Sequence, residues 1–296
     1  MNLIKKYLPQ LLLVISSAFW GASFIFTKDL FETEPNITPL IIITGRMLVA
    51  TLVTLPLLKL TGKLEPIKKG HLGYFMLLAF AEPFLYSLFE TGGVQLVSGS
   101  LASIIIATIP LFIPFGMALV YHEKLKAMTF VGVILSLIGI SIMSLNEDFS
   151  FSANPKGLVL LACAVVIAVV FTIILVKILG HYSPMTITAY QNMFGLIYFL
   201  PVMLVFDYNT LPTLSYSPHM LLFITFLGIF CSTAAYMCFN YGMRSLGATA
   251  GSVYNNIIPV FSLLFALMMG QESLSILKVV GIAVVFIGLT LAQRKR

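Results

Sequence analysis

Charged residues are scarce in this sequence. Only 9% of its 296 residues are Asp, Glu, Lys or Arg, whereas a soluble domain carries about 25%. Hydrophobic residues make up 59% of the chain, and the mean hydropathy is +1.02. In water, a protein of this size has too much surface to cover with so few charges. The composition therefore excludes a soluble globular domain and predicts a chain that is solvated mainly by lipid.

Residues that carry chemistry are also few. Three cysteines lie within apolar stretches without metal-ligand spacing, and we expect them to pack as small, inert apolar side chains: Cys163, Cys231 and Cys238. The four histidines stand singly near the ends of different apolar stretches: His71, His122, His181 and His219. No Gly-rich phosphate loop is present, which argues against ATP-driven pumping. We expect no metal or other cofactor, and a multi-span membrane enzyme is the least favoured alternative.

Long apolar stretches dominate the rest of the chain. About 20 apolar residues cross the bilayer core as a helix, and ten stretches meet this length: Pro9–Leu30, Thr38–Leu58, His71–Val94, Gly99–Tyr121, Ala127–Leu145, Pro155–Leu179, Met185–Phe206, Pro218–Tyr241, Gly247–Met269 and Ser275–Gln293. The strands of a membrane β-barrel are shorter and alternate in polarity. The sequence therefore predicts an all-α integral membrane protein with ten transmembrane helices.

Positive charges are distributed unevenly between the two ends of these stretches. With a cytoplasmic N-terminus, 13 of the 17 Lys and Arg residues fall in cytoplasmic segments, three fall outside, and Arg46 lies within a span. This bias is the usual orientation signal of membrane proteins. We therefore expect both termini in the cytoplasm. Since topology accounts for most of the net charge of +6, the charge gives no reason to expect a nucleic-acid partner.

The two halves of the sequence repeat each other. A constant offset of 149 residues joins identical residues: Gly93 and Gly242, Ser103 and Ser252, Pro110 and Pro259, Glu123 and Glu272, Leu125 and Leu274, Gly132 and Gly281, Gly139 and Gly288. Each half holds five predicted helices, and five is odd, so the second copy is inverted in the membrane. We predict two inverted-topology five-helix repeats, residues 1–148 and 149–296. Many secondary transporters are built in this way, with the site between the repeats.

The repeated motifs also resemble a known family. They are Ser98–Ser103, Pro110, Tyr121–Leu125, Gly132 and Gly139 in the first half, and Gly247–Ser252, Pro259, Gly270–Leu274, Gly281 and Gly288 in the second. This pattern resembles the drug/metabolite transporter superfamily, in its EamA-type branch of ten helices and two repeats. The resemblance spans essentially the whole chain. It implies a carrier of small metabolites in the inner or plasma membrane, often an exporter of amino acids. It does not specify the substrate.

Three ionisable residues fall within the predicted spans: Arg46, Glu82 and Glu90. An unpaired charge at bilayer depth costs at least about 2.5–3.5 kcal/mol, so such groups are functional candidates. Glu82, Tyr86 and Glu90 are four residues apart and share one helix face. By depth, Glu82 matches Arg46, and Glu90 lies nearer the outer mouth. Either Arg46 and Glu82 form a pair that only locks two helices together, or they bind a solute or, at Glu82, a coupled proton.

The other candidate residues are uncharged. Trp20, the only tryptophan, lies in the middle of a span, and polar side chains follow in the second half: Gln191, Asn192, Tyr236, Asn240, Tyr254, Asn255 and Asn256. They suit a small zwitterionic or polar solute. Alternatively, Trp20 packs in the core and the amides tie helices together, each worth about 0.6 kcal/mol. Pro83, Pro110 and Pro259 each remove a helical hydrogen bond, as hinges or as static bends.

Together these features predict a secondary transporter of small polar metabolites, with export of amino acids or metabolites by alternating access favoured and proton coupling as an option. Its expected partners are a small-molecule substrate and the lipid bilayer. A monomer is compatible with the sequence. A passive facilitator or channel is the main alternative, and saturable counterflow would separate carrier from pore.

Overall fold

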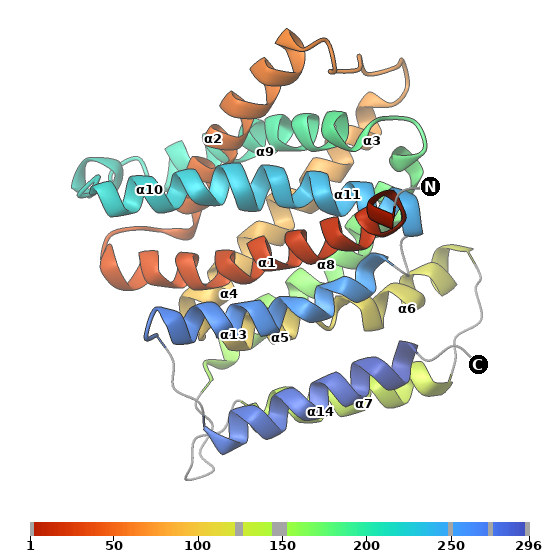
Figure 1. The fold of residues 1–296 in the computed structure, drawn as a ribbon. Helices are drawn as coiled ribbons and strands as arrows, with labels where there is room; N and C mark the ends of the chain where they lie inside the picture. Colours follow the sequence, from red (N-terminus) through yellow and green to blue (C-terminus); the bar gives the residue numbers. More distant parts are fainter. Residues whose placement is uncertain (1–2, 122–126, 144–152, 248–250, 272–274, 294–296) are drawn as a thin grey trace.

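A computed structural model describes residues 3–121, 127–143, 153–247, 251–271 and 275–293, which contain helices and no strands (Figure 1). Glu123, Glu272 and the predicted repeat boundary after residue 148 lie outside the described residues. The start of α1 and the end of α14 lie at the same end of the bundle (Figure 1).

The first half of the chain forms five helical segments. They are α1 (Leu3–Thr33), α2 (Pro39–Leu60), a third segment made of α3 (Leu72–Ala79), η1 (Phe80–Leu85) and α4 (Tyr86–Leu96), a fourth made of α5 (Gly99–Ile106) and α6 (Ile109–Tyr121), and α7 (Ala127–Met143). The element η1 is π-helical and contains Pro83.

The second half follows the same plan. Its elements are α8 (Pro155–Leu179), α9 (Pro184–Phe206), the loop turn η2 (Leu211–Thr213), a broken segment of α10 (Pro218–Phe226), η3 (Leu227–Ala234) and α11 (Ala235–Leu246), then η4 (Val253–Ile257) with α13 (Ile258–Met268), and α14 (Ile276–Gln293). Seven helical stretches among the described residues are long and apolar enough to cross a membrane, and three shorter apolar helices accompany them: Phe130–Ile142, Val253–Met268 and Ile276–Gly288. These ten segments confirm the predicted all-α architecture.

Four helices begin with the same local device. A polar N-cap side chain accepts a backbone N–H of the first turn, and a proline follows it directly: Thr38–Pro39, Asn154–Pro155, Ser183–Pro184 and Ser217–Pro218. The cap satisfies a backbone donor that the helix leaves free, and proline suits the first helical position because it has no N–H to satisfy. The sequence therefore sets these helix starts locally.

The 149-residue repeat is present in the backbone. The π-helical element η1 ends at Leu85, and its counterpart η3 ends at Ala234. Helix α6, the second part of the fourth segment, begins at Ile109, and helix α13, the second part of the ninth segment, begins at Ile258. Each of these pairs differs by 149 positions, so the breaks in the helices, like the sequence motifs, occur in register in both halves.

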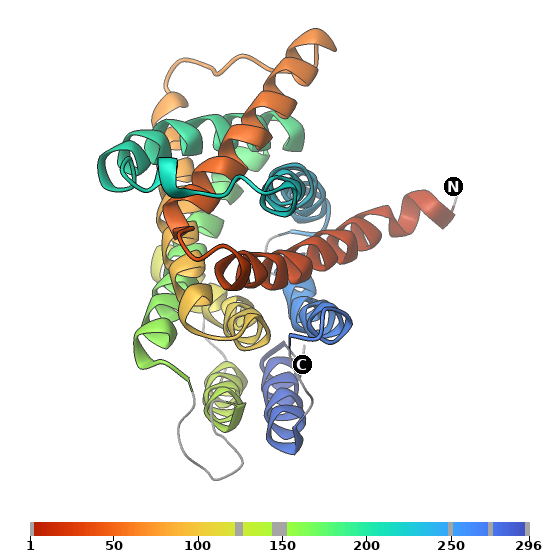
Figure 2. The same cartoon turned by 90° about the vertical axis from the view of Figure 1, so that its left-hand side faces the viewer.

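The fifth and tenth segments show this symmetry as a close contact. Helices α7 and α14 run side by side in both views (Figures 1 and 2). A Cβ atom added at Gly139 would lie 2.7 Å from the carbonyl oxygen of Gly281, and one added at Gly288 would lie 2.7 Å from the carbonyl oxygen of Gly132. Only glycine permits so close an approach of two helix backbones. The repeated glycines therefore join the two repeats through a reciprocal contact.

Two polar ties join the two repeats near opposite ends of α2, one to the residues just before α10 and the other to the start of α9. Before α2 begins, Glu34 accepts hydrogen bonds from the hydroxyls of Ser215 and Ser217. We call this set the Glu34 tie. After α2 ends, Glu65 accepts the backbone N–H of Ser183 at 2.8 Å, which forms the Glu65 tie. Position 183 is the counterpart of position 34 under the 149-residue offset, so the ties occupy equivalent places at the two ends.

Candidate functional site

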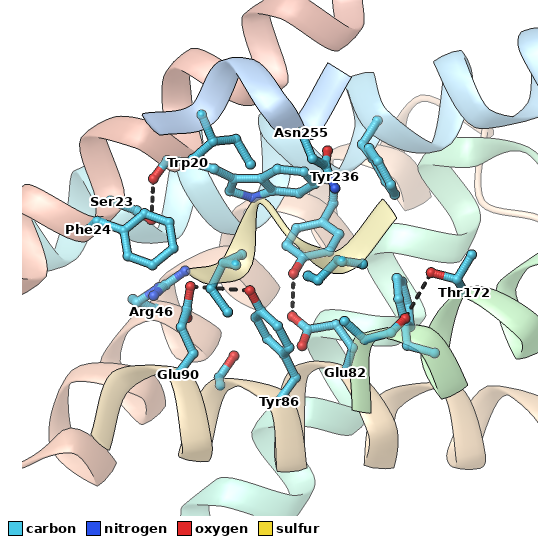
Figure 3. Close-up of a pocket in the computed structure, with 17 residues that line it drawn as sticks. Trp20, Ser23, Phe24, Arg46, Glu82, Tyr86, Glu90, Thr172, Tyr236 and Asn255 are labelled. Carbon is cyan, nitrogen blue, oxygen red and sulfur yellow. Dashed lines mark hydrogen bonds between the residues drawn. The ribbon is translucent and has the colours of Figure 1, made fainter. Parts of the chain in front are cut away.

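A cavity lies between the two repeats. It is lined by residues of α1, α2 and the third and fourth segments, and by residues of α8, α11, η4 and α13. Seven predicted site residues line it: Trp20, Arg46, Glu82, Tyr86, Glu90, Tyr236 and Asn255 (Figure 3). All lie in the ten apolar segments, which places the cavity within the part of the protein expected to lie in the bilayer.

The break in the third segment positions Glu82. Its backbone is non-helical, with φ −140° and ψ 117°, and the Glu82–Pro83 peptide bond is cis. The break frees the carbonyl oxygen of Glu82 from the helical ladder, and the side-chain amide of Gln191 in α9 donates to it at 3.0 Å. An irregular backbone at this depth is tolerated where it is buried in protein or lines a cavity. Gln191 thus stabilises the break and the position of Glu82.

The two oxygens of the Glu82 carboxylate have different surroundings. The hydroxyl of Tyr236, from the second repeat, donates to Oε1. Oε2 is buried and has no hydrogen-bond partner among the described residues. The side chain is only 3% exposed. A buried carboxylate oxygen that lacks a donor is costly, so Oε2 is a site for a proton or for a donor group of a bound solute.

Arg46 does not pair with Glu82. Its Nε donates to the Ser232 hydroxyl at 3.2 Å, and among the described residues no ion pair joins Arg46 to a carboxylate. In Figure 3, Arg46 lies on one side of the cavity and Glu82 on the other. Of the two alternatives for Arg46 and Glu82, the locking pair is therefore not formed in this structure. Depth along two helices sets the level of each residue but not the direction in which its side chain points.

Glu90 and Tyr86 share one face of α4, as their spacing predicts, but Glu82, predicted on the same helix face, lies in the non-helical break before α4. The Tyr86 hydroxyl donates to Glu90 Oε1 at 3.4 Å. Both residues line the cavity together with Arg46. The charged lining is therefore one guanidinium and two carboxylates, all contributed by the first repeat.

Trp20 forms an aromatic wall of the cavity. Its indole N–H donates to the carbonyl oxygen of Cys231 at 3.2 Å, which lies in the π-helical element η3. The ring packs against Tyr236 and Phe239, with centroids 5.1 and 5.0 Å apart. Trp20 therefore packs against neighbouring rings, as its alternative role predicts, and it also lines the cavity, while its contact with a solute stays a prediction.

The remaining predicted amides and one tyrosine lie outside the cavity lining: Gln191, Asn192, Asn240, Tyr254 and Asn256. Asn192 donates to the Thr233 hydroxyl at 3.4 Å, and Asn240 donates to the Thr188 hydroxyl at 3.1 Å. The Tyr254 backbone carbonyl accepts the Ser17 hydroxyl at 2.8 Å. Asn256 is buried. With Gln191, the first two amides join helices to one another, which is the alternative role considered for them.

The three prolines lie at helix breaks. Pro83 is inside η1, while Pro110 and Pro259 are the second residues of α6 and α13. A proline in the first helical turn needs no hydrogen-bond acceptor for its nitrogen. The prolines therefore stand where the third, fourth and ninth segments divide, and their action as hinges remains a prediction.

Several polar residues of the site were not predicted. Ser23, Ser87 and Thr172 line the cavity, and Ser232 binds Arg46. Serine and threonine are common in membrane helices, where they often bond their own backbone, as Thr172 does with the Ala168 carbonyl at 2.8 Å. Their presence alone therefore gave no signal. Ser232 follows Cys231, the counterpart of Glu82, and this position was the available clue.

The histidines correct a second expectation. From the sequence, we expect the histidines to stand apart from one another. In the structure, the ring centroids of His71 and His181 are 5.1 Å apart. His122 lies outside the described residues. No group of three or more His, Cys, Asp or Glu side chains suited to a metal occurs in the part of the chain that the structure describes.

Comparison with known proteins identifies the family. The model of the EamA-like transporter family matches residues 8–145 and again residues 155–293. The chain belongs to the EamA-like transporter family. This confirms the resemblance of the motifs, and the double match agrees with the two-repeat architecture. The protein is therefore a multi-pass membrane transporter whose family implies a small-molecule substrate.

Relatives of this EamA-like transporter carry the same general description. It is 25% identical to the uncharacterized transporter YetK of Bacillus subtilis, over 99% of this chain and 89% of the relative. It is 27% identical to an uncharacterized transporter of Archaeoglobus fulgidus, over 99% and 100%. It is 24% identical to the uncharacterized inner membrane transporter YedA of Escherichia coli, over 92% and 86%. A solved crystal structure has the same fold, with a TM-score of 0.70, 16% identity and coverage of 96% and 95%.

Proposed function

We propose that this EamA-like transporter is a secondary carrier of small zwitterionic metabolites, with amino acids as the first candidates, and that the central cavity is its binding site. The observation that carries the proposal is the unsatisfied Oε2 of Glu82, buried across the cavity from Arg46. A solute with a carboxylate at one end and an ammonium at the other complements the guanidinium and this oxygen together. Trp20 and Tyr236 bound the space for its side chain.

The charges of the lining favour exchange of the solute for protons. Arg46 contributes one positive charge, and Glu82 and Glu90 contribute two negative charges when both are ionised. An ammonium group and a proton compete for the same Glu82 oxygen, so the site holds one or the other. Protons that enter the cell then displace the solute outward. This competition supports export coupled to proton entry.

The fold supports alternating access. Many inverted-repeat transporters move one repeat against the other around a site at the midplane. Here the Glu34 tie and the Glu65 tie join the two repeats near opposite ends of α2, the first to the residues before α10 and the second to the start of α9. Opening either end requires release of the tie at that end, while the cavity residues stay between them. We further propose that both termini face the cytoplasm, from the positive-charge bias, and that the protein resides in the cell membrane, as the name of YedA states for that relative.

Transport by the purified chain in proteoliposomes tests this function. We expect saturable uptake and counterflow for at least one member of a panel of amino acids, nucleosides, sugars and cationic drugs, with dependence on a pH gradient. Glu82→Gln should abolish the pH dependence, and Arg46→Ala should weaken the binding of a carboxylate-bearing solute. Flux without counterflow would identify a passive pore. Absence of flux for every solute would contradict the carrier.

A further inference from the structure

A second pocket, separate from the central cavity, lies at the membrane boundary. It is lined by His71, Tyr74, Lys177, Ile178 and His181. His71 is the residue before α3 begins, and Lys177 stands in the last turn of α8. The pocket therefore opens where two membrane-spanning segments end, at the end of the bundle that holds the start of α1 (Figure 1).

Tyr182 fixes the hydrogen-bonding state of this pocket. The backbone N–H of Lys68 donates to the Tyr182 hydroxyl oxygen at 2.9 Å, and His71 Nδ1 lies 3.0 Å from the same oxygen. Because the Lys68 N–H donates to the Tyr182 hydroxyl oxygen, the Tyr182 O–H can itself donate to His71 Nδ1. In neutral His71 the ring proton is then on Nε2, and in protonated His71 both nitrogens carry one. In both states Nε2–H remains a donor for a ligand.

Positive charge surrounds the pocket. Lys177 lines it, and the Lys68 ammonium lies 5.9 Å from the centroid of the Tyr182 ring. Arg244 donates to the Tyr182 carbonyl oxygen at 3.4 Å. The neighbouring acid is Glu65, and its Oε1 is occupied by the backbone N–H of Ser183 in the Glu65 tie. The lining therefore provides two imidazoles and a lysine as hydrogen-bond donors, and it contains no carboxylate. These groups suit an anionic ligand.

We propose that this pocket binds the phosphate of an anionic phospholipid headgroup. The phosphate oxygens would accept hydrogen bonds from His71, His181 and Lys177. Two leucines of α3, the helix that begins just after His71, are half exposed: Leu72 at 49% and Leu77 at 50%. They offer a surface for the acyl chains. The charge bias of the sequence assigns this end to the cytoplasm, where anionic lipids give the leaflet a negative surface potential.

A bound lipid also contacts a part of the protein that transport must move. The pocket joins α3 to the turn between α8 and α9, and Tyr182 in that turn directly precedes Ser183 of the Glu65 tie. A phosphate held by both His71 and His181 would connect the same two segments that this tie connects. Occupancy should therefore stabilise the tied state.

Native mass spectrometry of the full chain in detergent, with phosphatidylglycerol or phosphatidylcholine added, tests the proposal. We expect one phosphatidylglycerol to be retained in preference to phosphatidylcholine. Lys177→Gln should lower its apparent affinity about fivefold, the effect of one lysine near an anionic surface, and His181→Gln should lower it further in the double variant. Lys156→Gln is the matched control, since Lys156 lies at the other end of α8, about 30 Å away. Thermal melting of each variant in lipid-free detergent checks that it folds.

Three results would overturn the proposal. The first is equal retention of the two lipids by the wild type. The second is an equal loss of phosphatidylglycerol in Lys156→Gln and Lys177→Gln. The third is displacement of the lipid by millimolar glycerol phosphate or inorganic phosphate, which would assign the pocket to a soluble phosphate. Because none of these measurements involves transport, their failure is distinguishable from failure of the carrier function.

Discussion

The hydroxyl of Tyr236 donates to the carboxylate of Glu82 across the interface between the two repeats. This bond links the buried acid of the first half to the second half, which contributes no charge to the cavity lining. Any movement of one repeat against the other changes the surroundings of Glu82. The bond is therefore the most direct place to test the coupling between solute binding and repeat motion.

Replacing Tyr236 by phenylalanine keeps the ring that packs on Trp20 and removes only the hydroxyl. A hydrogen bond to a charged group is worth about 1.5–3 kcal/mol, so the variant should change the apparent affinity for solute roughly tenfold and alter its pH profile. Initial-rate kinetics in proteoliposomes at several pH values measure both. Tyr241→Phe, at an exposed position of the same helix, is the control. Unchanged kinetics in Tyr236→Phe would show that the bond has no part in transport.

The single tryptophan provides an intrinsic reporter of occupancy. Trp20 lines the cavity and lies within 5.1 Å of the Tyr236 ring, measured between centroids. A transported solute should change the tryptophan emission in a saturable manner, and a solute that is not transported should not. Trp20→Phe should abolish the signal. A transported solute that leaves the emission unchanged would place its binding site elsewhere.

Close packing of α7 on α14 should be sensitive to small additions. Gly139→Ala and Gly288→Ala each introduce a Cβ 2.7 Å from a backbone oxygen, and we expect each to destabilise the protein by about 1–3 kcal/mol. The two effects should not add, because both residues belong to one interface. Gly73→Ala is the control, since its Cβ meets nothing within 4 Å. Thermal melting in detergent compares the variants. Equal melting temperatures for all three would contradict this contact.

Acid should weaken the Glu34 tie. Hydrogen bonds from Ser215 and Ser217 lower the pKa of Glu34 below its ordinary value of 4.5, and His219 adds a smaller electrostatic contribution in the same direction. A carboxylate with a lowered pKa stabilises the folded state above its ordinary pKa, and this stabilisation is lost as the pH falls through the lowered value. Wild-type stability should therefore decrease below about pH 4.5, measured as melting temperature against pH.

Glu34→Gln should be less stable than the wild type at neutral pH and should respond less to acid. Glu32→Gln is the matched control, because Glu32 is on the same segment with its side chain 54% exposed and only a long contact to Lys28. If the control reproduced the behaviour of Glu34→Gln, the tie would not be the cause of the acid sensitivity.

The sequence predicts the fold well because the relevant signals do not depend on how side chains of different helices pack. The length of an apolar stretch defines a span, a polar cap followed by proline defines a helix start, and the 149-residue offset defines the repeat. Ionisable residues within spans also indicated the cavity, since Arg46, Glu82 and Glu90 all line it. Burying a charge at this depth is costly, so few alternatives exist for such residues.

Contacts between distant segments were harder to predict. Asn192 and Asn240 point to neighbouring helices instead of the cavity, and Arg46 binds Ser232 instead of Glu82. These outcomes depend on the rotation of each helix about its axis, which nearly uniform apolar sequences do not encode. His71 and His181 meet because two loops fold toward each other. Neither position alone indicates that contact.

The two repeats have similar backbones but unequal side chains. In the alternating access proposed here, passage from the inward-facing to the outward-facing state exchanges the conformations of the two halves. Were the halves chemically identical, the empty protein would populate both states equally. Here Glu82 corresponds to Cys231 and Arg46 to Gly195, so the exchange alters the environment of every cavity charge. The empty transporter should therefore rest predominantly in one facing direction, and a solute shifts that preference only as far as it binds the two states unequally.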